Sequence, residues 1–228
     1  MRFGLRWRIH GMATVRREYR ALQRANDGPL LVCANHLTMV DSAIIAWALG
    51  SPAWFLVHYA TLPWNVPERR NFAGSVTSRV LVYLMKCVPV VRGGDRRNVA
   101  GVLARLAWLL GRGEVVLVFP EGGRSRSGRV EVESAAWGVG RLIAGVPSCR
   151  VLCVYLRGSR QDGFGNLPAP GEQFHIRLAV LRPQSELTGM RRAQDLSQQV
   201  VRTLARLEEQ QLQERELQGA GTPGAGIQ

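Results

Sequence analysis

The chain has 228 residues and a mass of 25.2 kDa, with 46% hydrophobic and 21% charged residues. This balance supplies the core of one sizeable domain and excludes wholesale disorder, a collagen, a coiled coil and a small disulfide scaffold. The 30 basic residues outnumber the 17 acidic ones and leave a formal net charge of +13. We therefore expect an anionic partner, which could be nucleic acid, phospholipid headgroups or a phosphorylated substrate.

Residues 1–27 are predicted to form a basic amphipathic segment. Arginines greatly outnumber acids there, and apolar side chains recur at helical spacing at Leu5, Ile9, Met12, Val15, Tyr19 and Leu22. Such a helix can lie in the interface of a bilayer, or it can pack on the domain with its basic face in solvent. The sequence leaves both placements open. All basic residues except Lys86 are arginines, which suit contacts with phosphate, although an arginine-rich codon usage would give the same composition.

Residues 28–216 show short apolar runs alternating with segments of helical period. This pattern predicts a single α/β domain with a mostly parallel, twisted sheet flanked by helices. The expected strands cover residues 30–34, 53–57, 88–91, 115–119, 151–156 and 174–181. The expected helices cover residues 42–49, a segment around 76–84, residues 99–110 with Asp95 as the N-cap, and residues 196–207. Residues 217–228 are rich in glycine and are expected to form a disordered tail.

The uncharged segment 42–67 is the nearest approach to a membrane span. Gly50-Ser51-Pro52 divides it, and Pro63 and Pro67 break it again, so neither part is long enough to cross a bilayer. No apolar stretch follows the first arginines, so no secretory signal is expected. The four cysteines form no CxxC pair and are expected to be reduced and mostly buried on the cytoplasmic side, with no disulfide and no metal.

Two polar segments that each follow a predicted strand carry the candidate chemistry. The first is NHLTMVD at residues 35–41, where His36 can act as a general base if Asp41 fixes its tautomer. Asp41 is equally suited to cap the following helix. The second is FPEGGRS at residues 119–125, whose glycines permit close backbone approach to a ligand and whose Arg124 can donate to phosphate. Both segments are expected at the carboxyl edge of the sheet, where open α/β sheets place ligands.

Together the two segments resemble the glycerolipid acyltransferase family that includes 1-acylglycerol-3-phosphate acyltransferase, whose hallmark blocks read NHxxxxD and FPEGTRS. Two weaker matches stand in the family's order, VPVVR at residues 88–92 and GVP at residues 145–147. The resemblance covers roughly residues 28–182 and implies a glycerol-3-phosphate acyltransferase-like fold.

The resemblance also implies roles for single residues. His36 would remove the proton from an acceptor hydroxyl, Asp41 would orient His36, and the hydroxyl would attack the thioester of acyl-CoA or acyl carrier protein, with no other cofactor. Acceptor binding maps to Arg92, Glu121, Gly122, Arg124 and Ser125. Glu121 suits acceptor hydroxyls or the orientation of an arginine, because a carboxylate repels phosphate. The apolar run 53–66 could line an acyl groove, although core packing explains most of it equally well.

The implied protein is an O-acyltransferase of phospholipid biosynthesis, peripheral to the cytoplasmic face of the membrane, with 1-acyl-sn-glycerol-3-phosphate as the leading acceptor. The sequence departs from the family at Gly123, which replaces threonine, and at Cys153, which replaces proline. Another lyso acceptor, such as an amino-acid-containing lipid, therefore remains open. The non-enzymatic alternative is a basic module that binds membrane or nucleic acid. Because no nucleic-acid motif is visible, we expect no nucleic-acid partner.

Overall fold

The structure is a computed structural model, and it describes residues 6–68, 84–91 and 96–220. Arg92, Asp95 and most of the helix expected around residues 76–84 lie outside these described residues. Within them a six-stranded sheet has the strand order β1-β6-β5-β2-β4-β3. Its strands are β1 (Arg8–Ile9), β2 (Leu30–Ala34), β3 (Trp64–Asn65), β4 (Val116–Val118), β5 (Arg150–Gly158) and β6 (Gln173–Leu181). Neighbouring strands are parallel except for β5 and β6, so the predicted mostly parallel α/β fold is confirmed.

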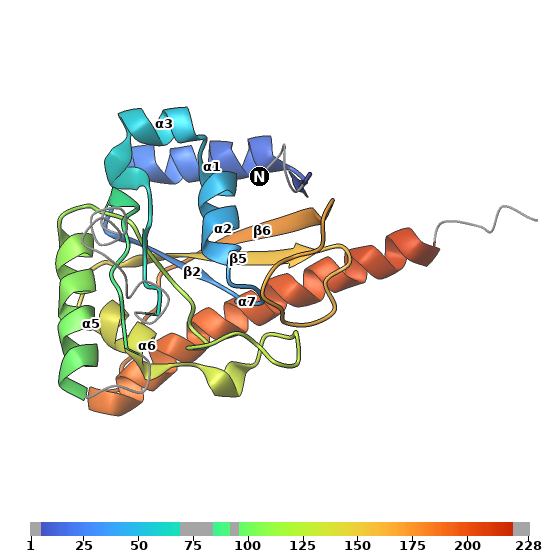
Figure 1. Cartoon of the computed structure of the whole chain (residues 1–228). Coiled ribbons are helices and arrows are strands. Elements are labelled where there is room, and N and C mark those ends of the chain that lie inside the picture. The colour runs from blue at the N-terminus through green and yellow to red at the C-terminus, as the bar shows by residue number, and fades with distance from the viewer. Residues whose placement is uncertain (1–5, 69–83, 92–95, 221–228) are drawn as a thin grey trace, which may run out of the picture.

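Helices cover both faces of the sheet (Figure 1). They are α1 (Met12–Ala25), α2 (Asp41–Leu49), α3 (Pro52–Val57), α5 (Arg96–Gly111), α6 (Trp137–Ala144) and α7 (Gly189–Ala220), with short 3-10 turns η1 (Tyr59–Thr61) and η3 (Val132–Ser134). Figure 1 shows α1 and α2 on one side of the sheet and α6 and α7 on the other. The expected helices at residues 42–49, 99–110 and 196–207 are confirmed as parts of α2, α5 and α7.

The central strand β2 is buried on both faces, as its uninterrupted apolar sequence predicts. Leu31 and Cys33 pack into the core shared with α5, α6 and α7, whereas Val32 and Ala34 pack into the core shared with α1 and α2. Because successive strand residues point to opposite faces, one five-residue strand joins the two layers. The loop that follows β2 therefore starts from a fixed point in the middle of the molecule.

The N-terminal segment combines a short strand with a helix. β1 pairs with β6, and α1 begins at Met12 after Gly11, which adopts a left-handed φ of 65°. Val15 and Tyr19 are buried in the core that α1 shares with α2. The described part of this segment thus packs on the domain and leaves its arginine-rich side outward.

The strand expected over residues 53–57 is wrong, because this segment is helix α3. The Ser51 side chain caps the helix by accepting a hydrogen bond from the Trp54 N–H at 3.2 Å, and Pro52 occupies the first turn, where its fixed φ favours a helix. These local signals outweigh the strand-like composition. Phe55 is buried in the core and Trp54 packs against it, whereas Leu56 and Val57 are 82% and 79% exposed.

Two further boundaries differ from the sequence prediction. Residues 88–91 form no sheet strand and contribute only an isolated bridge between Glu68 and Val90, beside another between Asn65 and Cys87. Helix α7 continues to Ala220, so residues 217–220 of the expected tail are helical. No helix within residues 6–68, 84–91 and 96–220 is both long and apolar enough to cross a membrane.

Candidate active site

The structure brings His36 and Asp41 together at the carboxyl end of β2. The Nδ1 atom of His36 lies 3.1 Å from the Oδ2 atom of Asp41, and the two residues are 8% and 3% exposed. Asp41 is the first residue of α2, and Val40 holds the N-cap position. A carboxylate in the first helical turn is favoured by the helix dipole. Burial and this fixed position leave the pair little freedom to separate.

Asp41 also folds the loop that carries His36. Its Oδ2 atom accepts hydrogen bonds from the N–H groups of Leu37 at 2.6 Å and Thr38 at 2.7 Å, and its Oδ1 atom accepts one from the Thr38 hydroxyl. Of the two tasks that the sequence left as alternatives, the structure shows the pairing with His36. The capping task is wrong, because Val40 holds the N-cap position without a side-chain cap and the Asp41 carboxylate accepts from residues that precede the helix.

The Asn35 side chain ties the same loop to the sheet. Its amide donates to the Leu156 carbonyl oxygen at 2.9 Å, and its carbonyl oxygen accepts from the Leu156 N–H at 2.7 Å. Asn35 thus extends the pairing of β2 with β5 by one residue and fixes the point where the loop leaves the sheet. Sequence reasoning gave Asn35 no role, because its partner lies on a distant strand.

The FPEGGRS segment lies against the first loop, as expected from its position after a neighbouring parallel strand. The imidazole of His36 stacks on the ring of Phe119, with centroids 3.9 Å apart and planes inclined by 14°. The Ser125 N–H donates to the His36 carbonyl oxygen at 2.9 Å. Among the described residues, none forms a hydrogen bond with Nε2 of His36. If Nδ1 carries the proton toward Asp41, Nε2 presents a free lone pair.

Arg124 is held by a third segment, the loop between β5 and β6. Its Nη1 atom donates to the Gly165 carbonyl oxygen at 2.7 Å and to the Asn166 side-chain oxygen at 3.1 Å, and its guanidinium lies 5.7 Å from the Phe164 ring centroid. The same loop reaches the His36 loop, because the Gly165 N–H donates to the Leu37 carbonyl oxygen at 2.9 Å. Sequence reasoning missed this wall of the site, since its contacts use mostly backbone atoms.

The family model described as Acyltransferase matches residues 6–157, which include both the His36 loop and the FPEGGRS loop. The chain belongs to this acyltransferase family. The predicted family is thereby confirmed, and the domain assignment makes the chain an enzyme that uses an acyl donor and an acyl acceptor. Comparison with curated protein sequences gives no significant match. The match to the acyltransferase family ends at residue 157, near the end of β5, so β6 and α7 lie beyond it.

The acyltransferase has an open pocket of about 500 Å³ beside the Arg124 loop, lined by Gly123, Arg124, Arg126 and Phe164. Arg124 uses Nη1 for the protein, and no described residue accepts from its Nη2 or Nε. Arg126 is exposed on the same loop. Two guanidinium groups at one pocket, one of them anchored, form a site suited to an anionic headgroup.

Glu121 lies at the inner side of this loop. Burial raises its pKa to about 7, partly opposed by the backbone N–H groups of Glu131 and His36. Its Oε1 atom is buried and has no hydrogen-bond partner among the residues that the structure describes. Of the two tasks expected for Glu121, orienting an arginine finds no contact among the described residues. The unsatisfied oxygen instead leaves a polar group free for a ligand.

Two other residues expected to bind the acceptor serve the loop itself. The Ser125 hydroxyl donates to the Arg129 carbonyl oxygen at 2.5 Å and lies 3.2 Å from the Ser127 hydroxyl. Gly122 adopts a φ of 72°, which permits its N–H to turn back to the Phe119 carbonyl oxygen at 3.1 Å. Arg92, the remaining expected residue, lies outside the described residues.

An apolar pocket of about 420 Å³ is lined in part by Phe119 and Gly122. It is enclosed by β4 and the facing sides of α5 and α6, with lining residues Val66, Val90, Val91, Val99, Val102, Leu103, Leu106, Val118, Ala136, Gly138, Val139 and Leu142. The run 53–66, expected as a possible acyl groove, contributes only Val66. Phe55 and Trp64 from that run are buried in the core, so the alternative of core packing holds for them.

Proposed function

We propose that this acyltransferase moves a fatty acyl group from acyl-CoA or acyl carrier protein to the hydroxyl of a lysophospholipid, with 1-acyl-sn-glycerol-3-phosphate as the leading acceptor in phospholipid biosynthesis. One observation carries the proposal. The buried His36–Asp41 pair adjoins the FPEGGRS loop, which bears Arg124 and whose Phe119 both stacks on His36 and lines the apolar pocket. An anionic headgroup and a fatty chain therefore both have a complementary surface next to one base.

The proposed chemistry starts at Nε2 of His36. This atom accepts the proton of the acceptor hydroxyl while the hydroxyl oxygen bonds to the thioester carbonyl carbon. Asp41 stabilises the imidazolium that forms, since its Oδ2 atom lies 3.1 Å from Nδ1 of His36. Collapse of the tetrahedral intermediate breaks the carbon–sulfur bond, and the proton on His36 passes to the departing thiolate. The products are the acylated acceptor and free thiol, and no acyl-enzyme is required.

Acceptor recognition in this proposal rests on charge and on one carboxyl group. Arg124 has donors to spare for a phosphate, and Arg126 adds a second guanidinium at the pocket. Glu121, with its pKa raised to about 7 by burial, is partly protonated near neutral pH and then repels phosphate less than an ordinary carboxylate. Its unpartnered oxygen can receive a glycerol hydroxyl.

The acyl chain is assigned to the apolar pocket between α5 and α6. A volume of about 420 Å³ lies within the usual range of small-ligand pockets, and its lining consists of valine, leucine, alanine and glycine apart from Phe119. Burial of each methylene of a chain contributes about 0.8 kcal/mol. The pocket therefore offers a favourable place for several methylenes close to His36, which stacks on Phe119 at the pocket wall.

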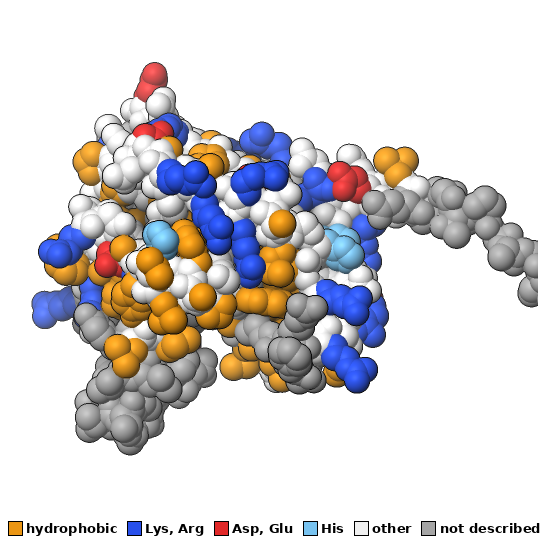
Figure 2. Space-filling model, turned by 90° about the horizontal axis from the view of Figure 1, so that it is seen from above, with side chains coloured by type: hydrophobic (Ala, Val, Ile, Leu, Met, Phe, Trp, Pro, Cys, Tyr) orange, Lys and Arg blue, Asp and Glu red, His pale blue; other side chains and the backbone are white. Residues whose placement is uncertain are grey.

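We further propose that the enzyme works as a peripheral protein at the cytoplasmic face of the membrane. Leu56 and Val57 on α3 and Tyr59 on η1 are 82%, 79% and 45% exposed. The Arg20 guanidinium of α1 lies 5.2 Å above the Trp54 ring of α3, so basic and apolar side chains adjoin. Figure 2 shows hydrophobic side chains gathered beside a band of Lys and Arg on this face. Such a surface suits anionic lipid.

The test of the activity is thiol release by purified protein from acyl-CoA and from acyl carrier protein, across a panel of lyso acceptors. We expect transfer to 1-acyl-sn-glycerol-3-phosphate and a loss of at least about 10³-fold in His36→Ala. His10→Ala is the matched control, because His10 is an exposed histidine that stacks on His175 away from the site. Transfer to another lyso acceptor alone would reassign the headgroup pocket, and no transfer to any acceptor would favour a non-catalytic binding module.

The membrane proposal is tested separately by sedimentation with phosphatidylglycerol vesicles. The double variant Leu56→Glu/Val57→Glu should bind at least about tenfold more weakly, because it removes apolar contact and adds negative charge. Leu187→Glu/Leu217→Glu is the control, since these residues are also exposed but lie near and on α7. Equal binding by both variants and the parent would contradict the assignment of this face.

A further inference from the structure

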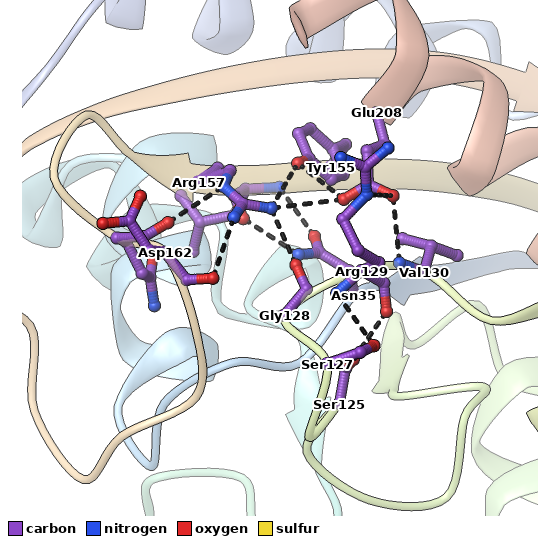
Figure 3. Close-up of polar contacts among 12 residues, drawn as sticks. Asn35, Ser125, Ser127, Gly128, Arg129, Val130, Tyr155, Arg157, Asp162 and Glu208 are labelled. Carbon is purple, nitrogen blue, oxygen red and sulfur yellow. Dashed lines mark hydrogen bonds and ion pairs between the residues drawn. The ribbon is translucent and has the colours of Figure 1, made fainter.

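Glu208 on α7 lies outside the family match and is surrounded by hydrogen-bond donors from β5 and from the segment that follows FPEGGRS (Figure 3). Glu208 is 3% exposed. Its Oε1 atom accepts from the Tyr155 hydroxyl at 3.1 Å and from Nη1 of Arg157 at 3.2 Å. Its Oε2 atom accepts from the Val130 N–H at 3.0 Å and lies 3.3 Å from Nε of Arg129. Four donors thus surround one carboxylate, two at each of its oxygens.

Arg157, the buried partner of Glu208, joins two loops by its remaining donors. Its Nη1 atom donates to the Gly128 carbonyl oxygen at 2.7 Å. Its Nε atom donates to the Gln161 carbonyl oxygen at 3.0 Å, and its Nη2 atom to the Asp162 carbonyl oxygen at 3.4 Å. Gly128 follows the FPEGGRS segment, whereas the other two belong to the β5–β6 loop. The Arg157 guanidinium thus bonds to the backbone of both the FPEGGRS loop and the β5–β6 loop.

The two loops meet backbone against backbone at this point. Gly128 has a φ of 72°, and a Cβ atom on it would lie 2.5 Å from the Asp162 carbonyl oxygen. Any side chain there would push the loops apart, so the contact depends on glycine. The Arg157–Glu208 pair then holds the FPEGGRS loop and the β5–β6 loop at this close spacing.

Each loop carries one half of the contact that fixes Arg124. The first loop bears Arg124 itself, and the second supplies Gly165 and Asn166, which accept from its guanidinium. The first loop also reaches the His36 carbonyl oxygen through the Ser125 N–H. A change in the spacing of the two loops therefore moves Arg124 relative to His36.

We propose that Glu208 is a positioning residue for acceptor binding, which acts through Arg157 to hold the FPEGGRS loop and the β5–β6 loop at the spacing that presents Arg124 to the acceptor. This inference rests on the proposed function, because it assigns Arg124 to the acceptor headgroup. Glu208 itself touches no substrate.

The energetics favour a positioning task over a gain in stability. The cost of burying an arginine and a glutamate takes up most of their mutual attraction, so a buried ion pair adds little net stability. Its geometry is nonetheless strongly directional, because both oxygens of Glu208 and all three nitrogens of Arg157 have partners. We therefore assign this network to holding the two loops in position relative to each other, and not to the stability of the fold.

The kinetic test compares Glu208→Gln with Glu209→Gln, an exposed neighbour on the same helix. We expect Glu208→Gln to raise KM for the acceptor about tenfold while kcat and KM for the acyl donor change by less than about twofold. Glu208→Asp, which keeps the charge, should recover part of the acceptor KM. Glu209→Gln should match the parent. A uniform loss of activity that follows only the fraction of folded protein would overturn the positioning task.

Amide hydrogen exchange of the ligand-free protein supplies a readout independent of activity. In Glu208→Gln the N–H groups of Ser125 and Gly165 should exchange at least about fivefold faster, since both hydrogen bonds depend on the loop spacing. The Leu152 N–H, in the centre of β5, should be unchanged. Equal protection of Ser125 and Gly165 in variant and parent would contradict the proposal.

If Glu208→Gln does not fold, Tyr155→Phe replaces it, because that variant removes one hydroxyl, which donates to Glu208 and accepts from Nη1 of Arg157 at 3.4 Å, and keeps the ion pair. It should raise the acceptor KM by about two- to threefold and leave the donor KM unchanged, and no change in the acceptor KM would count against the network. Failure of the proposed function would be recognised separately, because the parent protein would then transfer no acyl group. The exchange rates of the Ser125 and Gly165 N–H groups would still show whether Glu208 holds the two loops.

Discussion

The two loops of the site are built in opposite ways. In the loop 35–41, the side-chain contacts that orient His36 join residues at most five positions apart, from Asp41 back to His36, Leu37 and Thr38, while Asn35 ties the start of the loop to Leu156. In the loop 119–130, the deciding contacts reach to the β5–β6 loop and to Glu208 on α7. The orientation of His36 therefore depends mainly on contacts within its own loop. The position of Arg124 depends on contacts with the β5–β6 loop and with α7.

This difference separates the proposed chemistry from the proposed recognition. A base held by its own loop is insensitive to small shifts elsewhere, because its orienting carboxylate moves with it. The position of Arg124, which is held by a loop distant in sequence, can be changed by substitutions far from it while His36 keeps its orientation. Acceptor preference should therefore change more readily than reactivity, and substitutions in the two loops should give different kinetic patterns.

The largest effect is expected for Asp41→Asn, which changes the residue that orients His36 within the loop 35–41. The amide cannot stabilise an imidazolium and can favour the wrong tautomer of His36, so kcat should fall about 10³-fold. The acceptor KM should change much less, since Arg124 makes no contact with Asp41 and keeps its bonds to Gly165 and Asn166. Steady-state kinetics with circular dichroism as the folding control checks this, with Asp162→Asn as an exposed aspartate for comparison. A rise in acceptor KM without a fall in kcat would erase the distinction between the loops.

The next effect is expected for Arg124→Gln, which attacks the remote assembly. Loss of the anchored guanidinium should raise KM for a phosphate-bearing acceptor by about tenfold to thirtyfold, and kcat should fall much less. Arg126→Gln is the control on the same loop, and it should change KM by less than about threefold because Arg126 is exposed. If the two variants behave alike, the hydrogen bonds to Gly165 and Asn166 have no bearing on recognition.

A smaller and more selective effect is expected when the apolar pocket is filled. Val102→Trp places a large ring among the pocket residues of α5, so transfer of long acyl chains should fall about tenfold relative to short chains. Ala100→Trp on the exposed side of the same helix should leave the chain-length profile unchanged. A competition assay with mixed acyl thioesters measures the ratio directly. An unchanged profile in Val102→Trp would place the acyl chain elsewhere.

The smallest effect concerns pH and Glu121. The folded protein holds the pKa of Glu121 at about 7, above the ordinary 4.5, because burial disfavours the ionised form. Between these two values the folded state binds more protons than the unfolded state, so stability from this group is present at low pH and is lost as pH rises toward 7. Glu121→Gln should therefore gain stability relative to the parent between pH 5 and pH 8, by about 1 kcal/mol after allowance for solvent screening. Urea unfolding at both pH values measures it, and a gain of equal size at the two values would argue against a raised pKa.

The accuracy of the sequence predictions follows the same division. β2, the strand over residues 30–34, and α2 were predicted nearly to the residue, because uninterrupted apolar burial and a polar helix start are local signals. The segment 53–57 was predicted as a strand from its apolar composition, yet Ser51 and Pro52 start a helix there. The acyl groove was placed on the same run, whereas the apolar pocket is formed by α5 and α6, whose facing sides look like ordinary core positions in the sequence.

The sequence by itself determined the family, the α/β fold and the pairing of His36 with Asp41, because these depend on motifs and on neighbours a few residues apart. The tertiary structure alone decided the partners of Arg124, the task of Asn35, the unsatisfied oxygen of Glu121 and the place of Glu208 beneath two loops. These depend on backbone carbonyls and on burial by segments more than 40 residues away. Backbone atoms are the same in every residue, so no pattern of side chains reveals where they will meet.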